Sequence, residues 1–491
     1  MEPDRTSSIN SNKTMISFFR RISPAQLILI GLIAASCAQP SSQVPAPRTP
    51  RTSALADQYR SDATRLIDAA LADNTAYLRI GEVADRFGSR LSGSPQLEAA
   101  IDWIVAKMRE DGLENVHTQA VMVPHWVRGE ESLELVTPRR LQLRMLGLGG
   151  SVGTPASGIT APVLVVSSFA ELTRRANEAR GRIVLYDAPF TTYGETVRYR
   201  GAGASAAARV GAVASLVRSI ASNSMQSPHT GAMRYDTTVA RIPSAAVSVE
   251  DATMLHRMQD RGERVTVTLR MAAATLPDAP SRNVIAELPG RERPDEVVVI
   301  GGHIDSWDVG QGAMDDAGGA FVAWEAVRLM KQLGLRPRRT VRIVHWTNEE
   351  NGGRGSATYR DANLGELAKH ILAIESDNGT FSPIGFRVSG SAATVAVAQG
   401  IGPLLTRIGA GLIEAERNGP EADIAPLVRL GVPGMGLTVD GTRYFWYHHS
   451  EADTFDKLDA AEVARCVAAM AVMAYVVAEM PEPLPRGAPT P

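Results

Sequence analysis

Hydrophobic residues in the C-terminal part of the chain form short continuous runs, separated by longer amphipathic segments. The runs lie at Glu296–Gly301, Thr340–Thr347, His370–Glu375 and Gly434–Val439, and each is typical of a buried strand. Between the first two, Gly318–Leu333 has the spacing of a helix with an apolar face. Strands that alternate with helices predict an α/β fold, with a mostly parallel sheet flanked by helices.

A different pattern occupies residues 131–277. Its apolar runs are shorter and alternate with many Gly, Ala, Ser and Thr residues, which is typical of a mainly β domain inserted into the first one. A chain of 491 residues is long enough for two cores. The predicted order is a signal segment at 1–37, a flexible linker at 38–55, a first domain in two parts at 56–130 and 278–480, the inserted domain at 131–277, and a Pro-rich tail at 481–491.

The N-terminal residues predict export from the cytoplasm. Arg20 and Arg21 precede the apolar run Leu27–Ala35, which is too short to span a bilayer and is followed by Ser36 and Cys37. The segment around Cys37 is similar to a bacterial lipoprotein signal, which predicts a lipid on Cys37 and a periplasm-facing membrane anchor. The alternative is a plain signal peptide and a secreted protein. Residues 1–14 read as an upstream extension, so Met15 is an alternative start to Met1.

Charge and cysteine content exclude several classes of protein. Lys and Arg number 51 against 53 Asp and Glu, for a net charge of -2, so no strong field attracts nucleic acid. The chain lacks the glycine-rich motifs that bind nucleotide phosphates. Its two cysteines, Cys37 and Cys466, form no disulfide framework if Cys37 is lipidated. We expect no nucleic-acid partner, and membrane contact only through the N-terminal lipid.

Residues able to bind metals follow the ends of successive predicted strands. They are His303 and Asp305 after the first strand, Asp315 and Asp316 in the next loop, Glu349 and Glu350 after the second, Asp377 after the third, and His448 and His449 after the fourth. Because the carboxyl ends of parallel strands meet at one edge of a sheet, we expect these side chains to lie close together.

The residue types in this cluster suit a two-zinc site. Zinc binds imidazole nitrogen and carboxylate oxygen, and only a carboxylate can bridge two ions about 3.5–4 Å apart. We assign the bridge to Asp315, with His303 and Asp377 on one ion and Glu350 with His448 or His449 on the other.

The two remaining acids of the cluster are assigned to catalysis. Glu349, next to a predicted ligand, is positioned to act as the general base toward a metal-bound water. Asp305, two residues from His303, could fix the ring tautomer of that histidine. Taken singly, a Glu-Glu pair is usually a solvated turn, and Asp-Asp before a helix is often a cap. The order and spacing of all these residues at strand ends favour the metal site.

Several segments carry a resemblance to the M28 family of metallopeptidases. They are His303–Asp316, Trp346–Gly353, Glu375–Asp377 and Tyr447–Thr454, together with Leu148–Pro155 and Ser227–Gly231 in the inserted domain. The resemblance implies a zinc-exopeptidase-like fold, a protease-associated (PA)-like inserted domain, and the same ligands and base. It selects His449 over His448 through the pattern His-[Ser/Thr]-x-x-Asp-Thr, and it implies a homodimer. Asn348 departs from the family, where Ala is common at this position.

The sequence therefore predicts a zinc-dependent exopeptidase that cleaves dipeptides or short peptides, as a dipeptidase or carboxypeptidase. An aminopeptidase acting on longer peptides is the alternative, and a non-catalytic receptor-like relative is disfavoured because all the ligands are present. Arg387, Arg443 and Tyr444 are candidates to hold the substrate carboxylate.

Overall fold

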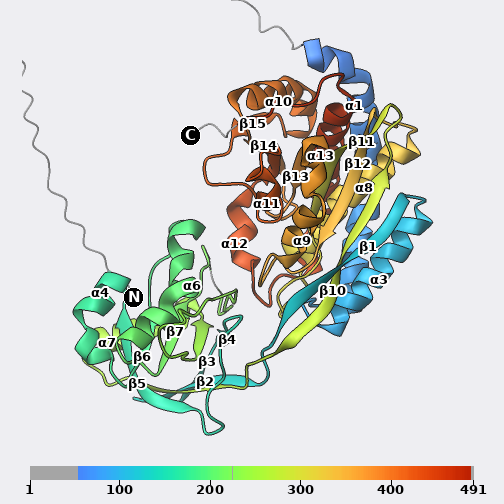
Figure 1. Ribbon diagram of the computed structural model, residues 1–491. Helices are drawn as coiled ribbons and strands as arrows, with labels where there is room; N and C mark the ends of the chain where they lie inside the picture. Colours follow the sequence, from blue (N-terminus) through green and yellow to red (C-terminus); the bar gives the residue numbers. More distant parts are fainter. Residues whose placement is uncertain (1–53, 224, 488–491) are drawn as a thin grey trace, which may run out of the picture. The chain divides into compact units, whose positions relative to one another are not determined.

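The computed structural model describes residues 54–223 and 225–487. Within this part, the chain builds two sheets of eight strands each, with helices packed around them (Figure 1). The predicted signal segment, the lipidation site Cys37 and nearly all of the predicted linker lie outside the described residues.

The first sheet is mixed, with the strand order β1-β10-β12-β11-β13-β16-β14-β15. The bounds are Glu114–Val127 (β1), Ala274–Leu288 (β10), Arg293–His303 (β11), Arg339–Trp346 (β12), His370–Glu375 (β13), Pro383–Ser389 (β14), Leu412–Ala415 (β15) and Gly434–Val439 (β16). The central strands β12, β11, β13 and β16 are mutually parallel, whereas β10 and β14 run antiparallel to their neighbours on this block. The parallel block contains the four strands that the sequence predicts.

Helices cover both faces of the first sheet. They are α1 (Ala54–Ala72), α2 (Thr75–Phe87), α3 (Pro95–Glu110), α8 (Gly318–Gln332), α9 (Arg354–Ala362), α10 (Ala392–Leu405), α11 (Ala425–Val428), α12 (Tyr444–Tyr447) and α13 (Ala460–Glu479). Val298 and Ile300 of β11 face one buried cluster with α8 and α13, while Val297 and Val299 face another with α9 and α11. This alternation is the strand period of two, with both faces buried. Helix α13 is long and apolar enough to cross a membrane, but here it is packed inside the core.

Strands β1 and β10 carry the chain out of the first sheet and back into it. They pair antiparallel along most of their length, from Glu114 opposite Glu287 to Val127 opposite Ala274. The residues between them, from β2 to β9 (131–271), form the second sheet and its helices, and are called the insert below. Both ends of the insert therefore leave from one two-stranded ribbon.

The insert is mixed α/β, which differs from the mainly β domain that the sequence predicts. Its strands, in the order β3-β2-β9-β5-β6-β7-β8-β4, are Glu131–Thr137 (β2), Leu141–Leu143 (β3), Met145–Gly147 (β4), Ile159–Val166 (β5), Ile183–Tyr186 (β6), Ala214–Arg218 (β7), Ser244–Val247 (β8) and Thr266–Met271 (β9). Its helices are α4 (Phe169–Arg174), α5 (Ala176–Ala179), α6 (Tyr193–Arg209) and α7 (Val249–Asp260). Helix α6 escapes prediction because its buried face is made largely of small residues such as Gly203, Ala204 and Ala207.

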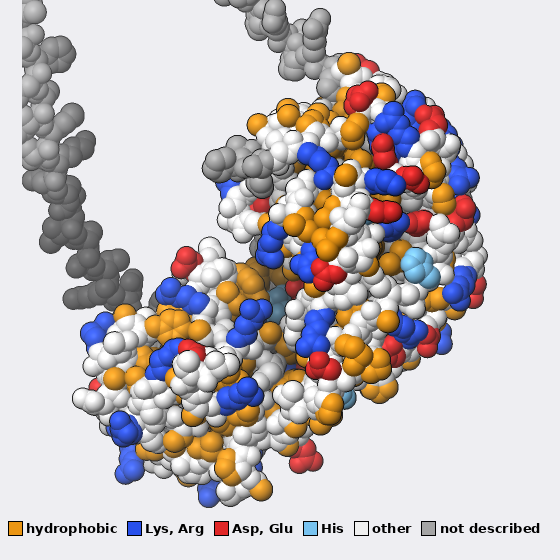
Figure 2. Space-filling view, viewed as in Figure 1, with side chains coloured by type: hydrophobic (Ala, Val, Ile, Leu, Met, Phe, Trp, Pro, Cys, Tyr) orange, Lys and Arg blue, Asp and Glu red, His pale blue; other side chains and the backbone are white. Residues whose placement is uncertain are grey.

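Five short irregular helices complete the described chain. They are η1 (Ala313–Ala317), η2 (Leu364–Lys369), η3 (Thr406–Ile408), η4 (Gly441–Arg443) and η5 (Phe455–Lys457). On the face drawn in Figure 2, basic and acidic side chains are interspersed over the first sheet and its helices, whereas basic side chains predominate over the insert.

Candidate metal centre

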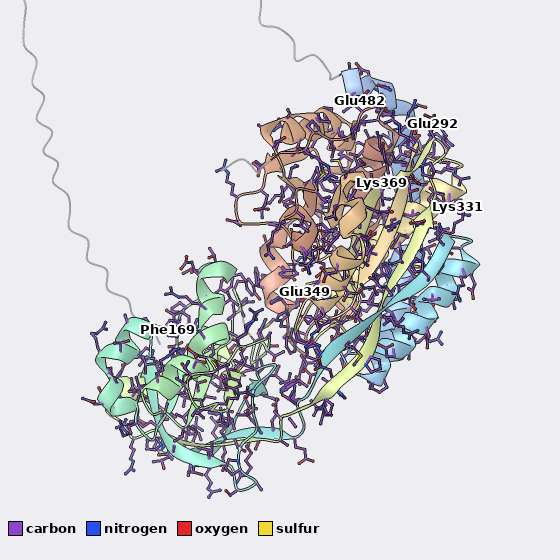
Figure 3. The ribbon with its side chains drawn as sticks, viewed as in Figure 1. Phe169, Glu292, Lys331, Glu349, Lys369 and Glu482 are labelled. Atoms are coloured by element: carbon purple, nitrogen blue, oxygen red, sulfur yellow. The ribbon has the colours of Figure 1, made fainter. Side chains whose placement is uncertain are left out.

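The predicted metal ligands meet at the carboxyl ends of the central strands. His303 is the last residue of β11, Glu349 and Glu350 follow β12, Asp377 follows β13, and His449 lies just after α12. Strands β11, β12 and β13 run parallel, so these ends share one edge of the sheet, where Figure 3 labels Glu349. This placement agrees with the rule that ligands bind beyond the carboxyl ends of parallel strands.

Asp315 lies at the middle of the cluster and faces a histidine on each side. Its Oδ1 is 3.3 Å from Nε2 of His303, and its Oδ2 is 3.4 Å from Nε2 of His449. His303 Nε2 is also 3.4 Å from Oδ1 of Asp377, and His449 Nε2 is 3.0 Å from Oε2 of Glu350. The five side chains therefore form two groups that share one carboxylate.

The donor set fits zinc. Both groups combine imidazole nitrogen with carboxylate oxygen, the ligands that Zn²⁺ takes in catalytic sites. Oδ2 of Asp315 is buried and has no hydrogen-bond partner among the described residues, as expected of an atom that serves a cation instead. Ligand atoms of His303, Asp315 and Asp377 lie within 4.8 Å of one another, and so do those of Asp315, His448 and His449.

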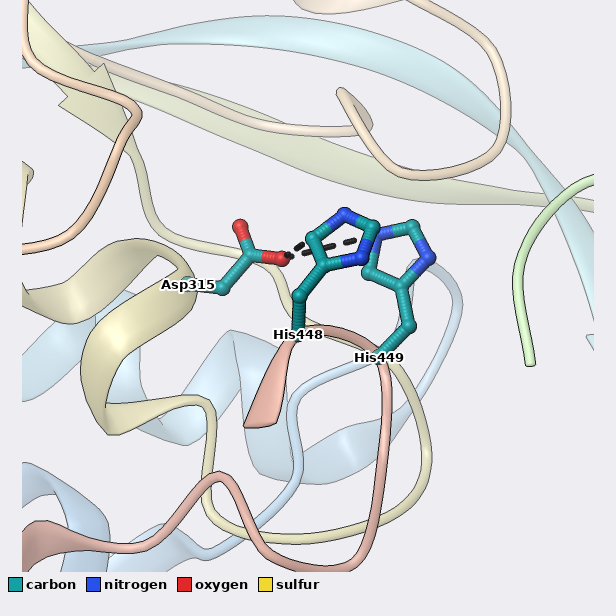
Figure 4. A group of neighbouring side chains, drawn as sticks. All are labelled: Asp315, His448 and His449. Atoms are coloured by element: carbon teal, nitrogen blue, oxygen red, sulfur yellow. Dashed lines mark ion pairs between the residues drawn. The ribbon is translucent and has the colours of Figure 1, made fainter. Parts of the chain in front are cut away.

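His448 and His449 both face Asp315, with their rings stacked 3.5 Å apart between centroids (Figure 4). Nε2 of His448 is 3.8 Å from Oδ2 of Asp315, farther than that of His449. Only the ring of His449, among the described histidines, also meets Glu350. The geometry therefore favours His449 as the ligand that completes the second group.

Two further aspartates hold the backbone of this centre. Asp453 accepts hydrogen bonds from the amides of Met314 and Asp315, at 2.8 and 3.2 Å. Asp316 accepts from the amide of His303 at 3.1 Å and from that of Gly319, at the start of α8, at 3.0 Å. These bonds fix the loop that presents Asp315, so Asp316 acts on the structure of the loop.

Asp305 is placed differently from the sequence prediction. Nδ1 of His303 lies 2.9 Å from the backbone carbonyl of Asp305, whereas the nearest carboxylate oxygen is 3.8 Å away. The carbonyl therefore orients the ring. The carboxylate accepts instead from the amides of Glu349 and Glu350, at 3.1 and 3.4 Å. Because both groups of one residue point at the centre, Asp305 positions His303 and the Glu349–Glu350 loop together.

The centre contains more carboxylates than the sequence suggests. Glu375 ends β13 and accepts from the amides of Asp423 and Ile424. Asp423 is buried. Burial and the nearby carboxylates of Asp305 and Asp377 raise its pKa to about 8, although His303 and the hydroxyl of Ser356 oppose the shift. Glu375 could have been found from its place beside Asp377, but no motif marks Asp423.

This excess of negative charge acts on Glu349. Burial, together with the carboxylates of Asp377, Asp423 and Asp305, raises the pKa of Glu349 well above its ordinary value, although His303 opposes the shift. A carboxylate with a raised pKa is a stronger base, which suits a group that accepts a proton from water. The cluster therefore attracts cations and tunes its candidate base.

The insert reaches the centre through contacts that sequence analysis missed. The amide of Thr230 donates to the carbonyl of His449 at 2.8 Å, and Nη1 of Arg200 lies 3.2 Å from Nδ1 of His449. The ring of Trp307 packs on Gly149, where an added Cβ would lie 2.0 Å from the indole. The position of His449 in the centre therefore depends partly on the insert.

His229 of the insert received no role from its sequence position. The structure buries it, and burial lowers its pKa to about 4, so its ring is neutral at physiological pH. It precedes Thr230, so this stretch of the insert lies against the loop of His449. The sequence could have indicated this contact, because Ser227–Gly231 is among the segments that resemble the M28 family.

Comparison with known proteins identifies the relatives of this chain. The model described as peptidase family M28 matches residues 283–474. Carboxypeptidase Q of Xenopus laevis is 48% identical over 87% of this chain and 92% of its own. A solved structure, of a peptidase M28 precursor from Shewanella amazonensis, has a TM-score of 0.85 and 33% identity over 89% of this chain and all of that one.

A more distant solved structure shares the fold alone. It is a zinc aminopeptidase from Bacillus subtilis, with a TM-score of 0.61 and 21% identity, covering 82% of this chain and 94% of that one. These likenesses agree with the mixed α/β architecture. With the relatives above, they confirm the resemblance seen in the sequence motifs.

Proposed function

The chain belongs to peptidase family M28 and is a metallopeptidase; from this premise we propose that it is a zinc-dependent exopeptidase acting on dipeptides and short peptides at a two-ion site. The observation that carries the proposal is Asp315, whose two oxygens face His303 on one side and His449 on the other. A shared carboxylate of this kind is what a pair of ions requires.

In this proposal, His303 and Asp377 complete one ion site and Glu350 and His449 the other, with Asp315 shared. When bound, the two zinc ions polarise the scissile carbonyl and lower the pKa of a water molecule. Glu349 accepts a proton from that water and returns it to the leaving amine.

The main test is Glu349→Gln. The substitution keeps the size of the side chain and removes the base, so we expect hydrolysis of a dipeptide to fall by about 10³-fold or more. Zinc content, measured by elemental analysis, should stay at two ions per chain. The control is Glu292→Gln, an exposed glutamate outside the site (Figure 3). Full activity of Glu349→Gln would show that the base is misassigned.

A comparison of substrates determines which class of exopeptidase the protein belongs to. A dipeptide, its N-acetylated form and a tripeptide carrying the same first two residues are compared by kcat/KM. Cleavage of the dipeptide alone identifies a dipeptidase. Cleavage of the N-acetylated dipeptide identifies a carboxypeptidase, and release of the first residue from the tripeptide identifies an aminopeptidase. Removal of zinc with a chelator should abolish turnover of every substrate, and added zinc should restore it.

We also propose that the protein is exported and lipid-anchored through Cys37, that the insert corresponds to a PA-like domain, and that the chain forms a homodimer. The N-terminal residues support export, and the family resemblance supports the PA-like domain and the dimer. Metabolic labelling with palmitate should label the protein, and Cys37→Ala should lose the label. Sedimentation of the mature protein should give the mass of two chains.

A further inference from the structure

An exopeptidase must hold one charged end of its substrate. The two arginines suggested by the sequence do not suit that task, and neither does Arg90, which the structure adds. Arg387 is exposed. Arg443 is engaged with Glu462 at 2.8 Å and lies over the ring of Phe381. Arg90, although buried at the centre, donates to backbone carbonyls such as those of Ile304 and Gly312. All three are therefore exposed or already paired.

Arg200 on α6 is different. It is 6% exposed, yet its guanidinium forms no ion pair with any carboxylate of the described residues. Nη1 donates to the carbonyl of Thr230 at 3.2 Å and lies 3.2 Å from Nδ1 of His449, and Nη2 donates to Oη of Tyr193 at 2.6 Å. Nε is buried with no partner among the described residues. Burying a charge without a partner of opposite charge costs free energy. An anionic ligand that pairs with Arg200 would explain why an arginine occupies this position.

The surroundings of Arg200 place it across from the catalytic carboxylates. Tyr193, its partner, stacks on Phe445 and meets His448 edge-on. The hydroxyl of Tyr193 therefore holds Arg200 beside the loop that carries His448 and His449. Arg200 and Tyr193 thus present positive charge and a hydroxyl from the insert, while the first sheet presents the acids.

We propose that Arg200, supported by Tyr193, binds the C-terminal carboxylate of the substrate. The inference rests on the proposed peptidase function and narrows its substrate class. Guanidinium matches the planar geometry of a carboxylate better than an ammonium does. Because Arg200 lies beside His449, a carboxylate bound there would fix the C-terminal end of the substrate at the candidate metal centre. The enzyme then acts as a dipeptidase or carboxypeptidase rather than as an aminopeptidase on long peptides.

The test compares one dipeptide as the free acid with the same dipeptide as its C-terminal amide. The readout is the ratio of the two kcat/KM values, which does not depend on the fraction of enzyme loaded with zinc. Wild type should favour the acid by about 10²-fold or more. Arg200→Met should bring the ratio close to one, mainly by lowering kcat/KM for the acid, and Arg200→Lys should give an intermediate ratio. Arg198→Met, an exposed arginine on the same helix, should leave the ratio unchanged.

Two results would overturn the assignment. Either wild type hydrolyses acid and amide equally, or Arg200→Met lowers both by the same factor, as expected if Arg200 only supports His449. If Arg200→Met is inactive on both, binding of acid and amide is measured by calorimetry in Glu349→Gln, with and without Arg200→Met. If the double variant still binds the acid more tightly than the amide, the assignment of Arg200 is also overturned. Failure of the proposed function looks different, because wild type then hydrolyses neither compound.

Discussion

The two sheets of this protein treat polar side chains at their strand ends in opposite ways. In the insert, Asp187 follows β6 and pairs with Arg218 of β7 at 3.0 Å and with Nδ1 of His256 at 2.7 Å. In the first sheet, no Lys or Arg of the described chain forms an ion pair with Asp315 or Glu350. Histidine rings are the only basic side chains of the described residues that pair with these two carboxylates. The same kind of edge is therefore neutralised in one sheet and left charged in the other.

The difference shows where chemistry can occur. A carboxylate with an arginine partner is stable in place and has little capacity left for a ligand. Buried carboxylates without a cationic side chain repel one another, so they gain from binding a metal and carry shifted pKa values. One residue of the insert also lacks a partner of opposite charge. Arg218 pairs with Asp187, whereas Arg200 pairs with no carboxylate of the described residues.

The largest effect expected from this comparison comes from exchanging one aspartate in each sheet for asparagine. Asp315→Asn removes the shared carboxylate, so zinc content should fall below two per chain and kcat/KM for a dipeptide should drop by about 10³-fold or more. Asp187→Asn should keep both zinc ions and stay within about threefold of wild-type activity. Similar losses of zinc in the two variants would contradict the contrast between the sheets.

A smaller effect concerns pH and the buried carboxyl group of Asp423. Its pKa is raised to about 8 in the folded protein, so the folded state holds a proton that the unfolded state releases near pH 4. In metal-free protein its contribution to stability is full below that pH and is lost as pH rises through about 8. Asp423→Asn should gain stability over wild type across this range, by a few kcal/mol at most, about the order that such a shift permits.

The measurement is urea unfolding of the chelated protein at pH 5, 7 and 9. Asp260→Asn, an exposed carboxylate in the insert with a side chain 69% accessible, serves as the control and should show no such trend. A constant difference between Asp423→Asn and wild type at all three pH values would argue that Asp423 is not protonated in the metal-free fold.

The smallest effect is expected at the start of α6, the helix of the insert that carries Tyr193 and Arg200. The hydroxyl of Thr192 accepts from the amide of Glu195 at 3.3 Å and caps this helix. Thr192→Ala should cost about 1 kcal/mol in the free energy of unfolding, with little change in zinc content. Thr191→Ala, at an exposed neighbour, should cost less than half as much. Equal losses would mean that the cap is not significant.

That the candidate ligands meet at one sheet edge was predictable because they follow strands whose apolar runs are continuous. His303, Glu350 and Asp377 each come within a few residues of such a run, and parallel strands bring their ends together by geometry alone. The sequence also predicted that Asp305 lies beside His303, but not which of its groups faces the ring. That choice depends on the backbone path after β11, which no residue pattern reports.

Other parts could not be predicted because their signals are long-range or weak. The outer half of β10 contains Pro277 and Asp278 and is largely exposed, so it lacks the alternation of a half-buried strand; its partner β1 is what orders it. Arg200 lies on a helix whose buried face is made largely of small residues, far along the chain from the metal cluster. Only tertiary structure brings it to His449.

The attachment of the insert to the metal loop has a consequence for how enzymes of this design can diverge. It relies on the main-chain amide of Thr230 and on the absence of a side chain at Gly149. Every residue except proline supplies that amide, so this bond survives most substitutions at Thr230, whereas Arg200 of α6 contacts His449 through its side chain. Chimeras that exchange the insert between homologues should therefore transfer a preference for substrates while the catalytic half is inherited unchanged.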